Sequence, residues 1–269
     1  MKLSKRWVVV SLALVSAACG TEESDDPAAY AEQAEDVLDL TPETGEAEIV
    51  GGATYYGLPG VGALITLPTN GNPGAICTGT LIDQWTVLTA AHCVDHATPA
   101  SLVFKIGVDA RNPQKTYDVW GIRVHPGWSR QHGNHDIAKV ILNHAANEPP
   151  AMLLSSLQDI GGVGAPLLFV GYGATNGSGA GTGTKRAVTI PITGIAPTYF
   201  TYQRPGASTC SGDSGGPAFF IDWRGRFLLA GVTSYGQSGC TGYGVDTNVS
   251  AYLGWLGKPG YPPAPMRVR

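Results

Sequence analysis

The chain has 269 residues, of which 37 are Gly and 19 are Pro, an excess that favours turns over long helices. Hydrophobic residues make up 43% and charged residues only 14%, so the chain can bury a sizeable core, which excludes a wholly disordered protein. The net charge of −4 is divided unevenly, because residues 1–48 hold 3 Lys and Arg against 11 Asp and Glu, whereas residues 49–269 hold 14 against 10. The larger part has no run of basic residues, which makes nucleic acid a poor candidate as a partner.

Residues 1–18 are predicted to be a signal peptide. Three basic residues precede the apolar run 7–18, which has the length of an export signal and is too short to span a bilayer. Cleavage after Ala18 would be ordinary for such a signal. The segment also resembles a bacterial lipobox with Cys19 as the lipidated residue, although Ser16 stands where that motif prefers Leu. A secretory signal and a lipid anchor therefore both remain open, and each predicts export.

Residues 19–48 are acidic, rich in Ala and nearly free of aromatic side chains. This composition is typical of a solvated, poorly ordered segment, and we interpret it as a propeptide or tether. A short amphipathic helix over residues 28–40 is the alternative.

From Ile49 onward, short runs rich in Val, Ile, Leu, Thr and Tyr recur between clusters of Gly, Pro and Asn, a pattern typical of strands and turns. About 220 residues of this kind predict an all-β fold with one large or two small barrels. Helices are expected only at residues 90–94 and 249–256, and the Pro-rich tail from about residue 257 is expected to be irregular. The predicted strand runs are residues 60–67, 85–90, 101–108, 118–124, 137–142, 165–173, 187–195 and 226–236.

Three short motifs carry the chemistry of nucleophilic catalysis, which needs a hydroxyl, a base and donors for the oxyanion. The segment GDSGGP places Ser214 between glycines, so that the backbone can turn the amides of Gly212 and Ser214 toward one point. TAAHC supplies the imidazole of His92, and HDIA supplies the carboxylate of Asp136 ahead of an apolar strand.

In this order, TAAHC, HDIA and GDSGGP resemble the trypsin/chymotrypsin family of serine endopeptidases. The likeness covers residues 49 to about 256 and includes the IVGG segment at Ile49, the SYG segment at Ser234 and the closing VSAYLGWL. It implies two antiparallel six-stranded β-barrels with the active site between them and a C-terminal helix, in a protease domain over residues 49–269.

The resemblance also implies the role of each catalytic residue. His92 would be the general base and then the acid, Asp136 would fix its tautomer, and Ser214 would form the acyl-enzyme. The amides of Gly212 and Ser214 would form the oxyanion hole. The other histidines are expected to have no catalytic part: His96, His125, His132, His135 and His144.

Family resemblance pairs the cysteines as Cys77 with Cys93, beside the base, and Cys210 with Cys240, beside the specificity pocket. Cys19 is left over, which favours the lipobox somewhat. Disulfides of this kind require an oxidising compartment. We expect no cofactor and no metal, because residues 107–118 lack the acidic pair with which some family members bind calcium.

Activation is expected to follow the family's zymogen mechanism, in which the freed ammonium of Ile49 pairs with Asp213 and orders the oxyanion hole. A buried carboxylate that lacks its cation is costly, so the uncut chain should be a poor catalyst. The residue before the cut is Glu48 rather than Lys or Arg. This implies an activating protease that tolerates Glu, and this enzyme itself is one candidate.

Ser208 is the residue expected at the base of the specificity pocket, where trypsin-like members hold Asp. A neutral base disfavours Lys and Arg, and the glycines at 236 and 244 would leave room for an aromatic or Leu side chain at P1, the substrate residue before the cleaved bond. Other substrate-binding residues carried over by resemblance are Thr209, Ser234, Tyr235, Gly236 and Gly244.

Cleavage after Glu is the rival specificity, since residues 1–48 contain seven Glu and the rest of the chain only Glu148. Against it, Thr233 stands where glutamate-specific relatives generally have His, and only Thr209 or Arg204 is left to bind a carboxylate.

Two functions of other classes compete with an exported, monomeric protease that acts on polypeptides. A catalytically silent relative that only binds a partner would be expected to have lost a member of the triad, and none is missing. A surface adhesin on the acidic stalk would leave the triad unexplained.

Overall fold

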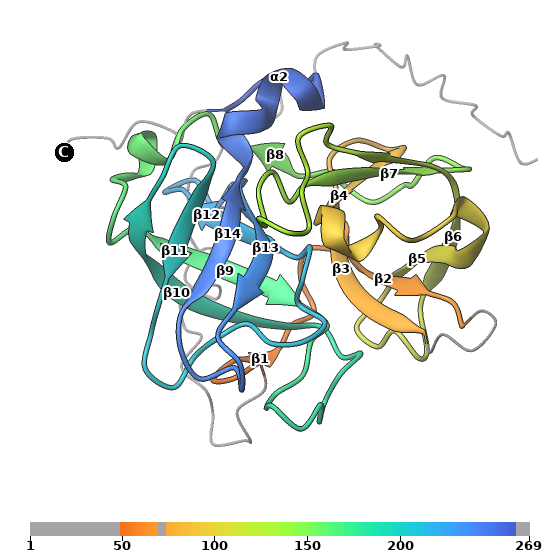
Figure 1. Cartoon of the computed structure of the whole chain (residues 1–269), viewed down its shortest axis with the longest axis horizontal. Coiled ribbons are helices and arrows are strands. Elements are labelled where there is room, and N and C mark those ends of the chain that lie inside the picture. Colours follow the sequence, from red (N-terminus) through yellow and green to blue (C-terminus); the bar gives the residue numbers. More distant parts are fainter. Residues whose placement is uncertain (1–48, 69–73, 262–269) are drawn as a thin grey trace, which may run out of the picture.

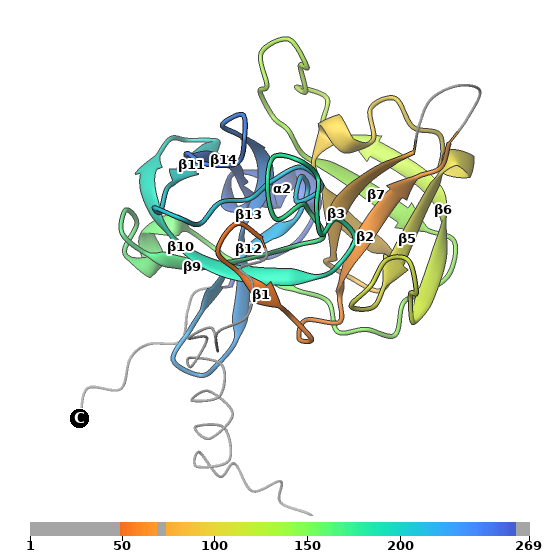
Figure 2. The same cartoon turned by 90° about the horizontal axis from the view of Figure 1, so that it is seen from below.

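The computed structural model describes residues 49–68 and 74–261, so the predicted signal peptide, Cys19, the acidic segment and residues 262–269 lie outside the described residues. Within the described part, the strands form two closed antiparallel barrels of six strands each, as the resemblance implied. Figures 1 and 2 show the two barrels side by side from two directions.

The first barrel closes in the order β2-β3-β4-β7-β6-β5. In β5 and β7 buried and half-buried residues alternate, which is the period-2 pattern of strands with one face toward a core. Phe104, Leu81 and Val87 are among the side chains that fill this core. The strands are β2 (Val61–Thr66), β3 (Ala75–Leu81), β4 (Thr86–Thr89), β5 (Leu102–Ile106), β6 (Lys115–Val124) and β7 (Ala138–Leu142).

The second barrel runs β10-β11-β14-β13-β12-β9 and closes through the pairing of β9 with β10. Its core contains Phe169, Phe200 and Tyr202. Two short strands, β1 (Ala53–Thr54) and β8 (Met152–Leu153), extend this sheet beside β10 and β13. The six barrel strands are β9 (Pro166–Gly171), β10 (Arg186–Ile195), β11 (Tyr199–Tyr202), β12 (Pro217–Ile221), β13 (Phe227–Gly236) and β14 (Gly244–Asn248).

Both predicted helical stretches are confirmed, although the first is a 3₁₀ helix throughout and the second begins as a 3₁₀ helix and ends as an α-helix. The first is η1 (Ala91–Cys93), and the second is η4 (Val249–Tyr252) followed by α2 (Leu253–Leu256). Two further 3₁₀ turns, η2 (Pro99–Ser101) and η3 (Leu157–Ile160), were not predicted. Within the described residues, no helix is both long and apolar enough to cross a membrane.

The two barrels share an apolar interface. One buried cluster contains Val61 and Ala63 of β2 together with Val170 of β9 and Phe219 of β12. Tyr172 is fully buried in this cluster. Its hydroxyl donates a hydrogen bond across the interface to the carbonyl oxygen of Gly107, on the first barrel, at 2.5 Å. Because the barrels are held by both apolar packing and hydrogen bonds, groups on one barrel have fixed positions relative to the other.

Gly215 and Gly225 offer a matched test of packing where the two barrels meet. Both have positive φ, but an added Cβ at Gly215 would lie 2.1 Å from Thr89 Oγ1, whereas nothing lies within 4 Å of one at Gly225. Ala at either position costs roughly 1–2 kcal/mol for the left-handed backbone, and Gly215→Ala should lose about 1–3 kcal/mol more through overpacking. Urea unfolding measures both variants; equal losses would contradict the close contact between the barrels.

Candidate active site

His92 and Asp136 form a hydrogen-bonded pair on the first barrel. η1, directly after β4, carries His92, and Asp136 precedes β7, the strand that pairs with β4. The distance from His92 Nδ1 to Asp136 Oδ2 is 2.7 Å, and the backbone N–H of His92 donates to Oδ1 at 2.9 Å. An ionised carboxylate can only accept, so it holds the proton on Nδ1 and leaves Nε2 as the acceptor.

Asp136 is also held by the second barrel. Ser234 Oγ on β13 donates to Asp136 Oδ2 at 2.5 Å, and Thr247 Oγ1 on β14 donates to the backbone carbonyl of Asp136 at 2.8 Å. The carboxylate is 3% exposed. Its hydrogen bonds therefore fix both its position and its orientation. The family resemblance had implied only a substrate-binding role for Ser234.

Ser214 lies in the loop that leads into β12, and this loop depends on glycine. Gly212 has φ +101° and Gly215 has φ +79°, values that L side chains rarely adopt. Among the described residues, the backbone N–H groups of Gly212 and Ser214 donate to no protein acceptor, whereas those of Asp213, Gly215 and Gly216 do, Gly215 N–H to Thr233 O at 2.7 Å. Two free N–H groups in one tight loop are what an oxyanion site needs.

His92 and Ser214 both lie beside the disulfide between Cys77 and Cys93. Cys93 Sγ lies 3.7 Å from His92 Nε2 and 3.6 Å from the carbonyl oxygen of Ser214. In the described part of the chain the Ser214 hydroxyl itself makes no hydrogen bond. Catalytic hydrogen bonds are often long before substrate binds, so this geometry leaves the hydroxyl available to Nε2.

The two disulfides present are the pairs that the resemblance implied. Cys77–Cys93 joins β3 to η1, and Cys210–Cys240 joins the segment before Ser214 to the segment between β13 and β14. The group Cys77, His92 and Cys93 has the spacing of a metal site, but both sulfurs are already in the disulfide and are not available as thiolate ligands.

Among the residues expected to form the specificity pocket, Ser234, Tyr235 and Gly236 lie at the end of β13 and Gly244 begins β14. Gly236 and Gly244 are paired across these strands, and Ser208, 3% exposed, donates its hydroxyl to the carbonyl oxygen of Thr209. Tyr235 is exposed at the same end of β13. The place that a Gly244 side chain would take is occupied by the phenol of Tyr202, whose oxygen would lie 2.2 Å from an added Cβ.

Two buried residues near Gly244 and Thr209 were missed by the sequence analysis, Tyr202 and Asp246. The Tyr202 hydroxyl lies 2.6 Å from Thr209 Oγ1. Asp246, on β14, is fully buried and faces the hydroxyls of Tyr202 and Thr233, yet neither carboxylate oxygen has a hydrogen bond of normal geometry among the described residues. Burial raises the pKa of Asp246 well above its usual value, because the charged form is poorly solvated there. A single acid within the run GVDTN was the signal that could have identified it.

The side chain of Asp213 is buried and is held by backbone N–H groups. Its carboxylate accepts hydrogen bonds from the backbone N–H groups of Gly173 and Cys210, each at 2.8 Å. A Cβ on Gly171 or Gly173 would overlap this carboxylate. Burial raises the pKa of Asp213 to about 7, although these hydrogen bonds and the charge of Arg186 lower it.

The segment that starts at Ile49 reaches the same region. Ile49 is fully buried, and the carbonyl oxygen of Val50 accepts a hydrogen bond from Ser208 N–H at 3.0 Å. Val50 also packs against the disulfide between Cys210 and Cys240. Ile49 has φ +55°, an unfavourable conformation for a β-branched residue.

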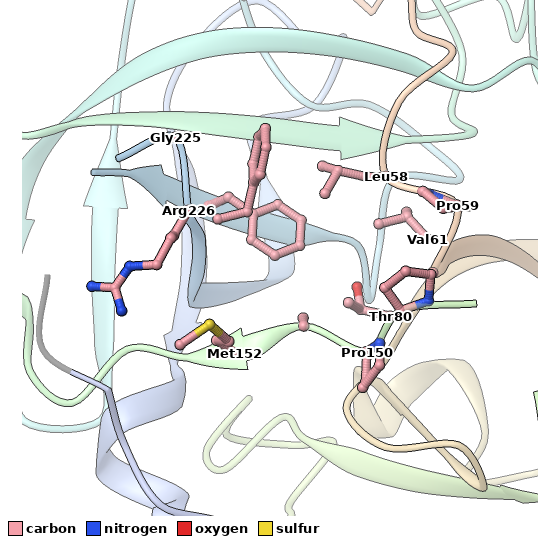
Figure 3. Close-up of a pocket in the computed structure, with 13 residues that line it drawn as sticks. Leu58, Pro59, Val61, Thr80, Pro150, Met152, Gly225 and Arg226 are labelled. Carbon is pink, nitrogen blue, oxygen red and sulfur yellow. The ribbon is translucent and has the colours of Figure 1, made fainter. Parts of the chain in front are cut away.

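A cavity of about 250 Å³ lies elsewhere between the barrels, and no predicted site residue lines it. Figure 3 shows it between Leu58, Val61 and Thr80 on one side and Met152 and Arg226 on the other. It is therefore distinct from the candidate active site.

The comparisons with known proteins agree with this geometry. The family model described as Trypsin matches residues 49–256. Chymotrypsin-like elastase family member 1 of Macaca fascicularis is 31% identical over 248 residues, which are 81% of this chain and 91% of that protein, and the Bos taurus protein of the same name is 30% identical over 67% of this chain and 77% of its own length. CLIP domain-containing serine protease B4 of Anopheles gambiae is 29% identical over 70% of this chain, and the match spans 62% of the mosquito protein, less than two thirds. This chain belongs to the trypsin family of serine endopeptidases.

Proposed function

We propose that this protein is an exported endopeptidase, made as a zymogen, in which Ser214, His92 and Asp136 form the catalytic triad and the amides of Gly212 and Ser214 the oxyanion hole. The observation that carries the proposal is the 2.7 Å hydrogen bond between His92 and Asp136, together with Cys93 Sγ, which lies 3.7 Å from His92 Nε2 and 3.6 Å from the carbonyl oxygen of Ser214. The substrates of the family are polypeptides. The two disulfides are typical of proteins outside the reducing cytosol, which supports export.

The proposed reaction divides amide hydrolysis into two steps. Ser214 Oγ attacks the carbonyl carbon while His92 Nε2 takes its proton, and the new oxyanion is bound by the two amides. Collapse breaks the C–N bond, the proton on Nε2 passes to the leaving amine, and an acyl-enzyme remains. Water then repeats the sequence, with His92 as base, and releases the acid.

Ser214→Ala should abolish peptide hydrolysis while the protein still folds, because the attacking oxygen is lost and little else touches this side chain. Turnover of a peptide amide by the full chain activated at Ile49 measures the effect, and circular dichroism checks the fold. Ser250→Ala is the control, since its hydroxyl bonds only to Asn248. Retained turnover in Ser214→Ala would refute the assignment.

At P1 we propose a preference for aromatic or Leu side chains. The residues expected at the pocket base, Ser208 and Thr209, carry neutral hydroxyl groups, and burial raises the pKa of Asp246, which favours its uncharged form. The name that two relatives share, chymotrypsin-like elastase, agrees with a non-basic P1 residue.

Cleavage after Glu stays the second candidate because of one structural observation. Glu148, the sole Glu after residue 48, is 8% exposed and bonded to Lys115 and Tyr117, so the domain presents no accessible Glu to itself. Against this candidate, Arg204 donates to the carbonyl oxygen of Thr189, and the Thr209 hydroxyl is taken up by Tyr202.

A mixed peptide library, cut by protein that begins at Ile49, should show cleavage after Phe, Tyr or Leu. Ser214→Ala is the blank. Cleavage after Glu would instead favour self-activation at Glu48. Cleavage after Lys or Arg would contradict the neutral pocket base, and Asp246→Asn would then remove that preference.

We further propose that the ammonium freed at Ile49 by an activating protease pairs with Asp213. Three observations support this: Ile49 is buried and the next residue, Val50, bonds to Ser208, the Asp213 carboxylate is buried, and Arg186 is the only basic side chain that acts on it among the described residues. Cleavage also removes the peptide bond that constrains φ of Ile49.

The raised pKa of Asp213 predicts how stability depends on pH before and after cleavage. In the uncut chain the folded state binds this proton more tightly than the unfolded state, whose carboxyl has the ordinary pKa of 3.8, so the free energy of unfolding should fall as pH rises from about 4 to 7 and then level off. After cleavage the ammonium should lower the pKa and reduce this fall.

Urea unfolding of Ser214→Ala, uncut and cut after Glu48, at pH 4, 5.5 and 7 tests the expectation. Asp213→Asn in the same background is the control, because it removes this proton and should abolish the difference between the two forms. Identical pH dependence with Asp213 present would contradict the ion pair.

A further inference from the structure

Thr78, on β3 of the first barrel, is a buried residue that the triad and the pocket leave without a role. It is 0% exposed and follows Cys77 of the first disulfide. β3 belongs to the first barrel, whereas the loop of Ser214 belongs to the second. Thr78 therefore lies where the two halves of the active site meet.

The hydrogen bonds of Thr78 reach both residues of the proposed oxyanion hole. Its backbone N–H donates to the carbonyl oxygen of Ser214 at 2.8 Å. Its Oγ1 donates to the carbonyl oxygen of Gly212 at 2.9 Å and accepts from the backbone N–H of Tyr172 at 3.1 Å. The hydroxyl thus donates its one proton to Gly212 and accepts the Tyr172 N–H with one lone pair.

The same residue is connected to the strand that carries the base. Its carbonyl oxygen accepts a hydrogen bond from Thr89 Oγ1 at 2.9 Å, three residues before His92. The loop is also packed closely against Thr78, since an added Cβ at Gly215 would lie 2.5 Å from its carbonyl oxygen and one at Gly216 would lie 3.2 Å from its Cβ. The loop has no room to shift toward β3.

These contacts act on the peptide that carries the Ser214 N–H. That peptide joins residues 213 and 214, and it lies between two carbonyl groups, those of Gly212 and Ser214, which are both fixed by Thr78. Gly212 lacks a Cβ and has φ +101°, so its own backbone preferences restrict it little. The direction of the two donor N–H groups therefore depends on an external restraint.

We propose that Thr78 is a positioning residue of the catalytic centre, whose hydroxyl holds the Gly212 carbonyl so that the amides of Gly212 and Ser214 converge on the oxyanion. The inference rests on the proposed function. Thr78 touches no substrate atom, so its removal affects the transition state rather than substrate binding.

Thr78→Val and Thr78→Ser separate the hydroxyl from the shape of the side chain. Loss of one direct oxyanion donor costs roughly 10²–10³ in kcat, and an indirect restraint should cost less, about 10- to 100-fold. We expect Thr78→Val to lower kcat by this factor with KM within about threefold, and Thr78→Ser to restore kcat to within about threefold of the wild-type value.

Thr80→Val is the matched control. Thr80 lies two residues along β3 and is also buried, but within the described chain its hydroxyl has no hydrogen-bond partner and it lines the cavity of Figure 3. Its removal should leave kcat and KM unchanged. A hydroxyl needed only for the stability of β3 would not produce this contrast.

A peptidyl boronic acid provides a second readout, because its tetrahedral adduct on Ser214 places an oxygen in the oxyanion hole. Its affinity should fall in Thr78→Val by about the same factor as kcat, whereas the affinity of the matching non-covalent peptide should not. If Thr78→Val fails to fold, Thr78→Ala against Thr80→Ala makes the same comparison.

Unchanged kcat in Thr78→Val, a rise in KM alone, or no recovery in Thr78→Ser would overturn the role of Thr78. A wild-type protein that does not hydrolyse peptides would instead refute the proposed function, so the two failures are distinguishable.

Discussion

The hydrogen bonds between the two barrels are the constraint on which the candidate site depends. His92 and Asp136 belong to the first barrel and Ser214 to the second, so neither barrel holds a complete site. Ser234 on the second barrel donates to Asp136, and Thr78 on the first binds the loop of Ser214, so each barrel orients the catalytic group of the other. The apolar cluster at the interface holds the two barrels together, and these hydrogen bonds set the orientation of the groups in the candidate site.

Strand prediction relied on apolar runs between turns, and it missed barrel strands of two kinds: the more polar β3 and β14, and the short apolar β11 (YFTY) and β12 (PAFFI). All eight predicted runs contain strands, but β3, β11, β12 and β14 were not among them. The sequences of β3 (AICTGTL) and β14 (GVDTN) contain Thr, Gly or Asp and little periodic pattern, yet β14 is fully buried because strands on both sides cover it. Their presence followed only from the family resemblance.

The site was predictable to the extent that its motifs are contiguous in sequence. TAAHC, HDIA and GDSGGP each identify one member of the proposed triad from its neighbours. Tyr202, Asp246 and Thr78 face partners that are not their neighbours in sequence, and Thr78 is 134 residues from Gly212. Such contacts arise from barrel closure, and a single sequence without relatives gives no information on which strands will pair.

The disulfide between Cys77 and Cys93 joins the residue that precedes Thr78 to the residue that follows His92. One covalent bond therefore connects the general base to the restraint on the nucleophile loop. In a reducing cytosol these cysteines would be free thiols, and both elements would lose their common anchor at the same time. Under the proposed function, disulfide formation after export would be a second requirement for activity, in addition to the proposed cleavage before Ile49.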